Sequence, residues 1–385
     1  MLSDRQILEK LISFDTTSVK SNLALIDWVA DFLDGQGVAV ALSYDETRSK
    51  ANLFATIGPE IPGGVVLSGH TDVVPVDGQD WTSDPFVLAE RDDRLYARGA
   101  SDMKAFIALA MSRVADFQAK ARRLPVHFAF SFDEEVGCLG VRHLIHSLPT
   151  GAARPQLAII GEPTLLQVVN AHKGGRRFTT TVTGLDGHSS ATHRGVSAIS
   201  AAAEIIRKID QIADRFRETA DPGSPFDPPY TTFNVGTIRG GTAQNIIARE
   251  CCFTWEFRAV PGTDAKAIIA EIDGFIAAEV LPRMRRVYER ASVVTEHAVG
   301  VPPLAPEKDG PAEALVRRLT GANGTGVVSF GTEAGLFQEA GISAIVCGPG
   351  SIDQAHKPDE WIALEQFAAG GAVMDRFGGW LANQN

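Results

Sequence analysis

Four short, almost entirely apolar runs most constrain what this chain can fold into. They lie at residues 65–67, 126–132, 157–160 and 344–347. Continuous apolar runs bounded by Gly or Pro are typical of strands that are buried on both faces, as in parallel sheets. Helical apolar spacing recurs between several of them and at the start of the chain, at residues 4–14, 22–33, 102–117, 311–319 and 361–377. The pattern predicts an α/β fold with a mixed, mostly parallel sheet flanked by helices.

The middle of the chain has a different pattern. Between residue 176 and about residue 290, we expect a strand, a helix, two strands, a helix and a strand, at residues 178–183, 198–216, 232–238, 251–257, 265–280 and 286–294. The order β-α-β-β-α-β is that of a ferredoxin-like α+β unit. A chain of 385 residues exceeds what one core usually serves. We therefore expect an inserted domain of residues 176–291 within a larger domain of residues 1–175 and 292–385.

The charge balance and the cysteines narrow the class of protein. With 36 Lys and Arg against 47 Asp and Glu, the formal net charge of −11 argues against a nucleic-acid or acidic-membrane partner. No apolar run approaches the roughly 18 residues of a membrane-spanning helix, and the first residues lack a signal-peptide pattern. The four cysteines (Cys138, Cys251, Cys252 and Cys347) show no C-x-x-C spacing. A cytoplasmic protein with a small-molecule partner is expected.

Histidines and acidic residues follow all four apolar runs. In chain order they are His70 and Asp72, Glu134 and Glu135, Glu162, and His356. In open α/β sheets, ligands bind beyond the carboxyl ends of the strands. We therefore expect these side chains to meet at one edge of the sheet.

A further carboxylate, Asp102, opens the predicted helix at residues 102–117. On its own it would serve as a helix N-cap. Two histidines and three carboxylates together provide nitrogen and oxygen ligands without sulfur, which suits Zn²⁺ or another first-row divalent ion. When each of two ions has two of these five ligands, the remaining carboxylate can bridge the ions, about 3.5–4 Å apart. This arrangement is used for metal-assisted hydrolysis.

The adjacent acids Glu134 and Glu135 are expected to have different roles. Consecutive side chains at a strand end diverge, so one can ligate while the other serves as a general base, with its pKa tuned by burial and its neighbours. Asp72, two residues after His70, can orient the His70 imidazole without binding the metal itself, or it can simply stabilise the turn.

Several segments resemble one enzyme family. They are residues 68–75, 98–104, 133–137 and 161–164, which resemble the dinuclear-zinc amidohydrolases that include acetylornithine deacetylase, succinyl-diaminopimelate desuccinylase and bacterial glutamate carboxypeptidases. Residues 332–334 and 348–360 are most similar to the acetylornithine deacetylase branch. The match spans essentially the whole chain, in order. It implies a zinc exopeptidase-like fold with an inserted lid or dimerisation domain.

The resemblance also implies roles for individual residues. His70 and Glu162 would bind one metal ion, and Glu135 and His356 would bind the other. Asp102 would bridge the two ions. Two divalent ions are implied, Zn²⁺ first and Co²⁺ as an alternative. Glu134 would be the base that later protonates the leaving amine.

The inserted domain supplies three more candidates. By resemblance, His188 reaches across a homodimer to polarise the scissile carbonyl in the partner's site, while Asn245 and Arg258 help to grip the substrate. The chemistry of Arg258 agrees, because a guanidinium at a strand end suits the α-carboxylate of an acylated amino acid. The alternatives are a surface role for Arg258 and purely local hydrogen bonds for His188.

The expected activity is hydrolysis of the N-acyl amide of a small amino acid, first of all N-acetyl-L-ornithine. The alternatives are desuccinylation of N-succinyl-diaminopimelate and a general aminoacylase or dipeptidase activity. A metal-containing binding protein without catalysis is a further alternative, since fold does not imply function. The intact base position, Glu134, argues against it.

Overall fold

The computed structural model describes residues 2–148 and 154–384. The chain divides into two compact units. The larger unit comprises Met1–Ala171, Leu304–Val327 and Thr332–Asn385, and the smaller unit comprises His172–Pro303 and Val328–Gly331.

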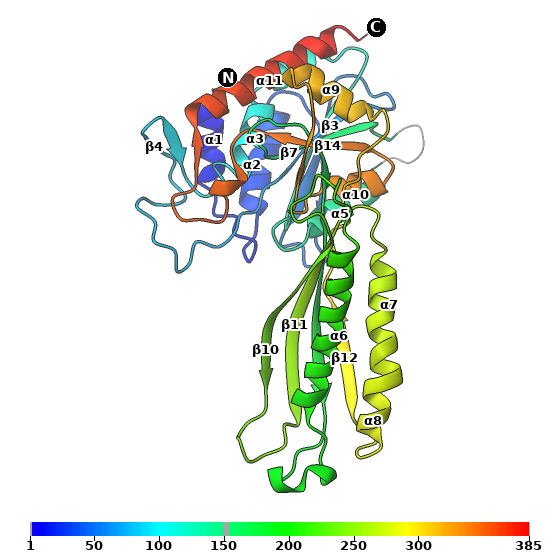
Figure 1. Cartoon of the computed structure of the whole chain (residues 1–385). Coiled ribbons are helices and arrows are strands. Elements are labelled where there is room, and N and C mark those ends of the chain that lie inside the picture. Colours follow the sequence, from blue (N-terminus) through cyan, green and yellow to red (C-terminus); the bar gives the residue numbers. More distant parts are fainter. Residues whose placement is uncertain (1, 149–153, 385) are drawn as a thin grey trace. The chain divides into compact units, whose positions relative to one another are not determined.

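An eight-stranded sheet of order β1-β2-β6-β3-β7-β14-β8-β13 forms the centre of the larger unit (Figure 1). Its strands are β1 (Val40–Tyr44), β2 (Ala51–Ile57), β3 (Val65–His70), β6 (Val126–Ser131), β7 (Leu157–Pro163), β8 (Val169–His172), β13 (Gly326–Val328) and β14 (Ser343–Gly348). The four adjacent strands β6, β3, β7 and β14 pair in parallel, whereas β2 pairs antiparallel with both β1 and β6, and β8 pairs antiparallel with β14. The four parallel strands are those that the apolar runs predict.

Both faces of these central strands are covered. Every residue of β3 and of β6 is buried, although successive side chains of a strand point to opposite faces. The helices of the unit are α1 (Asp4–Ile12), α2 (Leu23–Asp34), α3 (Lys104–Met111), α4 (Val114–Lys120), α5 (Leu139–Ser147), α9 (Pro311–Thr320), α10 (Ala334–Glu339) and α11 (Leu364–Ala382). The predicted fold class, a mostly parallel sheet flanked by helices, is confirmed.

Two predicted helices have different limits. The helix expected at residues 361–377 begins only at Leu364, because Trp361–Ala363 form strand β15, which pairs with β5 (Arg94–Tyr96). β4 (Ala89–Arg91) completes this three-stranded sheet. The helix expected at residues 102–117 is two helices, α3 and α4, so that Asp102 lies in the turn before α3.

The smaller unit has one antiparallel sheet of order β10-β11-β9-β12. Its elements are β9 (Gly174–Thr183), η2 (Ser189–Arg194), α6 (Ala198–Glu218), β10 (Thr232–Gly240), β11 (Glu250–Ala259), α7 (Ala265–Phe275), η3 (Ile276–Val280), α8 (Leu281–Arg285) and β12 (Ser292–His297). Helices α6 and α7 lie side by side along the sheet (Figure 1). This is the expected β-α-β-β-α-β order, but the last strand begins at Ser292, because α8 and a turn occupy the preceding residues.

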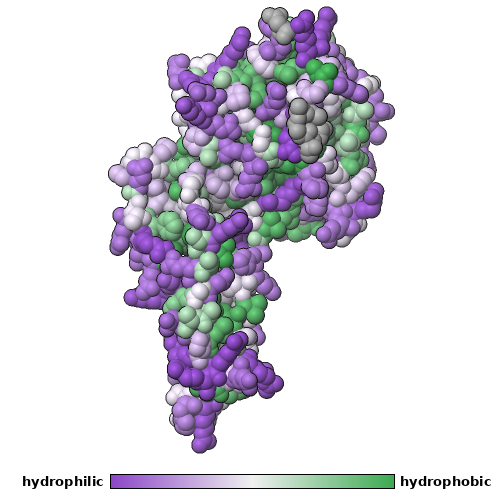
Figure 2. Space-filling model, turned by 90° about the vertical axis from the view of Figure 1, so that its right-hand side faces the viewer, coloured by the Kyte–Doolittle hydropathy of each residue, from purple (hydrophilic) through white to green (hydrophobic). Residues whose placement is uncertain are grey.

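Alternating burial along β11 places one face of this sheet in a core. Cys251 is buried and Cys252 is partly exposed, as expected for neighbours on opposite faces of a strand, and all four cysteines are free. Several large hydrophobic side chains of the unit are exposed, among them Ile238, Ile246 and Val294. Figure 2 shows hydrophobic patches between hydrophilic residues on the surface of this unit, which occupies the lower half of the view.

None of the helices in the described part of the chain is long and apolar enough to cross a membrane.

Candidate metal centre

The ends of the parallel strands carry the predicted ligands. His70 is the last residue of β3, and Glu162 lies near the end of β7. Glu135 follows β6, and His356 lies in the segment after β14. Because these strands are parallel and adjacent, their carboxyl ends lie at the same edge of the sheet.

The structure brings these residues and Asp102 together in two groups. One group is His70, Asp102 and Glu162, and the other is Asp102, Glu135 and His356; within each, ligand atoms of all three residues lie within 4.8 Å of one another. Asp102 Oδ1 is 3.1 Å from His70 Nε2, and Asp102 Oδ2 is 3.5 Å from His356 Nε2. His356 Nε2 is also 3.0 Å from Glu135 Oε2. Asp102 therefore directs one carboxylate oxygen to each group.

The buried carboxylates and imidazoles shift one another's pKa values. Burial and the charge of Asp102 raise the pKa of Glu162 well above its usual value. Hydrogen bonds with Asp102 and Glu135 raise the pKa of His356 to about 10, although 54% of its side chain is exposed. Burial opposes protonation of His70, but its hydrogen bond with Asp102 and the charge of Glu162 outweigh this, so its pKa is raised well above normal. The cluster therefore holds protons strongly, and a bound divalent cation can take the place of these protons.

This donor set fits two divalent metal ions. It combines three carboxylates with two imidazoles, the oxygen and nitrogen ligands that zinc and other first-row ions accept. His70 Nδ1–H donates to the main-chain carbonyl of Asp72 at 2.8 Å, so the neutral ring keeps its Nε2 lone pair for a metal. His70 and Glu162 could hold one ion, Glu135 and His356 the other, and Asp102 both.

Glu134 lies close enough to both groups for the charges of His70 and Glu135 to affect its carboxyl group. Its Oε1 accepts a hydrogen bond from Cys138 Sγ at 3.3 Å. Burial raises the pKa of Glu134 to about 8; the positive charge of His70 lowers it, and the negative charge of Glu135 raises it further. A carboxyl group whose pKa lies near neutrality is suited to accept and return a proton.

Asp72 contacts His70 differently from the prediction. Its carboxylate Oδ1 is 3.6 Å from His70 Nδ1, and the imidazole is held by the main-chain carbonyl of Asp72 instead. The carboxylate accepts the backbone N–H groups of Glu134 at 3.0 Å and Glu135 at 3.3 Å, and the hydroxyl of Ser18 at 2.7 Å. Asp72 thus orients three site residues, two of them through their main chain.

Another buried carboxylate, Glu333, adjoins the site and was not predicted. It accepts hydrogen bonds from Ser68 Oγ at 3.1 Å and from Ser131 Oγ, which lie on β3 and β6. Burial raises the pKa of Glu333 to about 7. Its position in the motif of residues 332–334 is a signal that the sequence does offer, whereas nothing in the sequence singles out Ser18.

The other three candidates belong to the smaller unit. The exposed His188 precedes η2, and its Nδ1 accepts the backbone N–H of Ser190 at 3.1 Å. The carbonyl of Asn245 accepts the N–H of Ser189 at 3.0 Å, and a cavity of about 640 Å³ adjoins these two segments. Arg258 is paired with Glu256, Nη2 to Oε2 at 3.1 Å. The roles of His188, Asn245 and Arg258 stay predictions.

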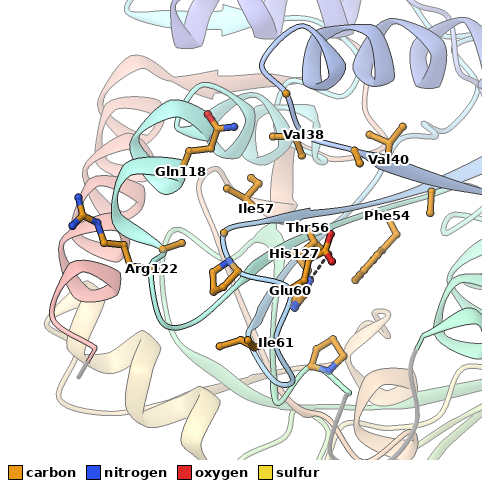
Figure 3. Close-up of a pocket in the computed structure, with 17 residues that line it drawn as sticks. Val38, Val40, Phe54, Thr56, Ile57, Glu60, Ile61, Gln118, Arg122 and His127 are labelled. Carbon is orange, nitrogen blue, oxygen red and sulfur yellow. Dashed lines mark hydrogen bonds between the residues drawn. The ribbon is translucent and has the colours of Figure 1, made fainter.

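A different cavity, of about 870 Å³, has none of these ligands among its lining residues, which Figure 3 shows. It is lined by residues of β1, β2, α4 and the start of β6, including Thr56 and His127. His127 is the second residue of β6, whereas Glu134 and Glu135 follow the carboxyl end of that strand. Both ring nitrogens of His127 are already in hydrogen bonds, with Thr56 and with the carbonyl of Gly63. This cavity is therefore separate from the metal centre.

Comparison with known proteins agrees with this geometry. The profile of Peptidase family M20/M25/M40 matches residues 66–378. The chain is 37% identical over 351 residues to an acetylornithine deacetylase of Proteus mirabilis (strain HI4320), which covers 91% of this chain and 88% of the relative. It is 37% identical over 347 residues to an acetylornithine deacetylase of Klebsiella pneumoniae (strain 342), covering 89% and 87%.

The fold has solved counterparts as well. The M20 family metallo-carboxypeptidase Sso-CP2 of Sulfolobus solfataricus superposes with a TM-score of 0.76 at 17% identity, with complete coverage of both chains. The family model and the two 37% identical relatives confirm the expected family. This chain belongs to peptidase family M20/M25/M40 and is a metal-dependent amidohydrolase.

Proposed function

We propose that the chain removes the acyl group from an N-acylated amino acid, with N-acetyl-L-ornithine as the preferred substrate. The observation that carries the reaction type is the pair of ligand groups that share Asp102, with Glu134 beside them. The proposed substrate is supported by the 37% identical relatives, which are named acetylornithine deacetylases. The free cysteines are consistent with a reducing cytoplasm, which is part of the proposal.

Two divalent ions, when bound by these ligands, would polarise the amide carbonyl and make water more acidic. Glu134 then accepts the proton from the attacking water and returns it to the departing amine nitrogen. Asp72 keeps the main chain of Glu134 in place during both transfers. Zn²⁺ is the first choice of metal for nitrogen and oxygen donors, with Co²⁺ as the alternative.

The carboxylate of the substrate is assigned to Arg258, together with Asn245. Arg258 and Arg177 both lie near Glu256, at 3.1 and 3.5 Å. Two guanidiniums and one carboxylate leave one net positive charge, which suits a substrate with a single carboxylate. N-acetylornithine has one carboxylate, whereas N-succinyl-diaminopimelate has several, so this cluster favours the acetylated substrate.

His188 is assigned to the carbonyl oxygen of the scissile amide. Because its Nδ1 accepts the N–H of Ser190, the neutral ring carries its proton on Nε2 and can donate it. Such a donor stabilises the negative charge that develops on the oxygen. We assign this donor to the site of a second subunit, in a homodimer formed through the smaller unit.

A substrate panel tests the proposal. N-acetylornithine, N-succinyl-diaminopimelate, N-acetylmethionine and an N-acetylated diamine without a carboxylate are assayed with Zn²⁺ and with Co²⁺. The expected order places N-acetylornithine first by kcat/KM and the diamine last, because the diamine has no group for Arg258. Preference for the succinylated substrate would make the protein a desuccinylase, and no hydrolysis with either metal would reduce it to a binding protein.

A further inference from the structure

Two of the proposed ligands lie in irregular segments with little regular secondary structure to hold them. Asp102 lies in the turn before α3, and its peptide bond to Met103 is cis. His356 lies in the segment between β14 and β15, with a positive φ of 64° and a half-exposed side chain. Metal ligands must keep a fixed geometry, so something else must position these two segments.

Glu360 holds the segment of Asp102. Its Oε1 accepts the backbone N–H groups of Ser101 at 2.8 Å and Asp102 at 3.0 Å. Its Oε2 accepts the N–H of Gly99 at 3.1 Å and Arg98 Nη1 at 2.8 Å. Four donors therefore converge on one carboxylate, and both Glu360 and Arg98 have only 1% of their side chains exposed.

Arg98 and Gln79 extend these contacts to the segment of His356. Arg98 Nη1 also donates to the carbonyl of Lys357 at 3.3 Å, and Arg98 Nη2 donates to Gln79 Oε1 at 2.6 Å. Gln79 Nε2 in turn donates to the carbonyl of His356 at 2.9 Å. A continuous series of hydrogen bonds thus runs from the main chain of Asp102 to the main chain of His356.

We propose that Glu360, Arg98 and Gln79 are positioning residues that set the spacing of Asp102 and His356 for the second metal ion. This inference rests on the proposed function, because it assumes that Asp102, Glu135 and His356 bind an ion. Burying a charged pair is costly, and an apolar pair often serves stability equally well. Only a carboxylate at position 360 can satisfy four donors that approach both of its oxygens, and three of these donors are main-chain N–H groups of the segment that carries Asp102.

Two substitutions test this inference with different risks to folding. In Glu360→Gln, the new amide group must face two of the four donors, because each oxygen of Glu360 accepts two hydrogen bonds. In Gln79→Glu, the half-buried side chain still accepts from Arg98 but no longer donates to the carbonyl of His356. Gln79→Glu leaves the buried pair intact and keeps the test valid if Glu360→Gln does not fold.

The first measurement is Zn²⁺ binding to metal-free protein by calorimetry, with the visible spectrum of bound Co²⁺ as a second signal. The wild-type chain is expected to bind two ions. Both variants should bind one of them about 10- to 100-fold more weakly, the usual effect of changing a group that orients a metal ligand. The activity of Gln79→Glu should recover at excess metal.

The second measurement, amide hydrogen exchange, needs no metal. In metal-free Glu360→Gln, main-chain amides among Gly99, Ser101 and Asp102 that face the new amide group should exchange faster than in the wild type, since they lose their acceptor. Matched controls in the same unit are Gln118→Glu, which changes the donor to the carbonyl of Gln36, and Glu307→Gln, which changes the acceptor of Gln338 and Ser343. Both controls should bind two ions as the wild type does.

The outcomes separate this inference from the proposed function. Folded variants that bind both ions with wild-type affinity would overturn the positioning role and leave the proposed function standing. A wild-type chain that binds no divalent ion would overturn the proposed function, and with it this inference.

Discussion

The carboxylate of Asp72 accepts the backbone N–H of Glu134 at a distance of 3.0 Å. Its second oxygen accepts the N–H of Glu135 and the hydroxyl of Ser18, while its main-chain carbonyl accepts the Nδ1–H of His70. Asp72, which follows β3, therefore orients His70 at the end of that strand. It also orients Glu134 and Glu135, the two acidic residues that follow the neighbouring strand β6.

Replacing that carboxylate tests this arrangement. Asp72→Asn preserves size but places an amide group where only acceptors fit, so Glu134 and Glu135 lose part of their fixed position. We expect kcat to fall about 10- to 100-fold, the usual effect of changing a group that orients a ligand, with a smaller change in KM. Steady-state kinetics at saturating metal measure the effect, with Asp31→Asn on the exposed side of α2 as the control. An unchanged kcat would show that these hydrogen bonds do not position the site.

Glu134 itself is tested by removing its ability to take a proton. Glu134→Gln should retain its bound metal and lose turnover by roughly 10²- to 10⁴-fold, the usual contribution of a positioned acid–base group. Metal content by elemental analysis and kcat are measured on the same preparation. Glu339→Gln, an exposed change on α10, serves as the control. Turnover that survives the substitution would place the base elsewhere.

Removal of the metal should abolish hydrolysis. Five side chains converge with oxygen and nitrogen atoms that suit metal ions, so we expect a chelator to inactivate the enzyme and added Zn²⁺ or Co²⁺ to restore it. Binding to the folded state alone should also raise the melting temperature of the metal-free protein as metal is added. Full activity after exhaustive demetallation would contradict the two-metal mechanism.

The sequence was sufficient to predict the edge where the site forms. The apolar runs that precede His70, Glu135 and Glu162 are typical of central strands, and adjacent parallel strands bring their carboxyl ends together. The assignment of Asp102 to both ligand groups depended on the family resemblance, because an acidic residue before a helix is equally suited to capping.

Contacts between distant segments were beyond the reach of the sequence. Nothing in the pattern distinguishes the main-chain carbonyl of Asp72 from its carboxylate as the partner of His70. Trp361–Ala363 continue the apolar spacing of the helix that follows them, and only their pairing with β5 makes them a strand. Glu360 is four residues from His356 in the chain, but its role depends on donors near residue 100.

The stability of the protein should depend on pH through His172. Its side chain is fully buried, and burial lowers its pKa to about 4 from an ordinary value of 6.5. Between these two pH values the unfolded chain binds a proton that the folded chain does not. Stability is therefore fully present above about pH 6.5 and falls as the pH decreases towards 4, by roughly 3 kcal/mol for a shift of this size.

Chemical denaturation at several pH values between 4 and 8 measures this dependence. His172→Gln removes the titrating group, so the slope of unfolding free energy against pH should be smaller than in the wild type. His193→Gln changes an exposed histidine of the same unit and should leave the slope unchanged. Equal slopes for His172→Gln and the wild type would show that His172 does not remain neutral in the folded state.

The proposed action of His188 in a partner's site predicts complementation between two inactive variants. Glu134→Ala removes the base but keeps His188, and His188→Ala does the reverse. In a mixed dimer, the site that keeps Glu134 receives His188 from the other subunit, so one of its two sites is complete. Random exchange in an equal mixture makes about half of the dimers mixed, so roughly a quarter of all sites should regain activity.

A role of His188 within its own subunit gives the opposite result, because neither site of the mixed dimer would then hold both residues. The assay therefore compares kcat of the mixture with kcat of each parent, after subunit exchange has been verified by mass spectrometry of differently tagged chains. A mixture of Glu134→Ala with Glu134→Ala/His188→Ala is the matched control, because it forms the same dimers without an intact base. Activity that stays at the parental level after exchange would confine His188 to local hydrogen bonds such as the one with Ser190.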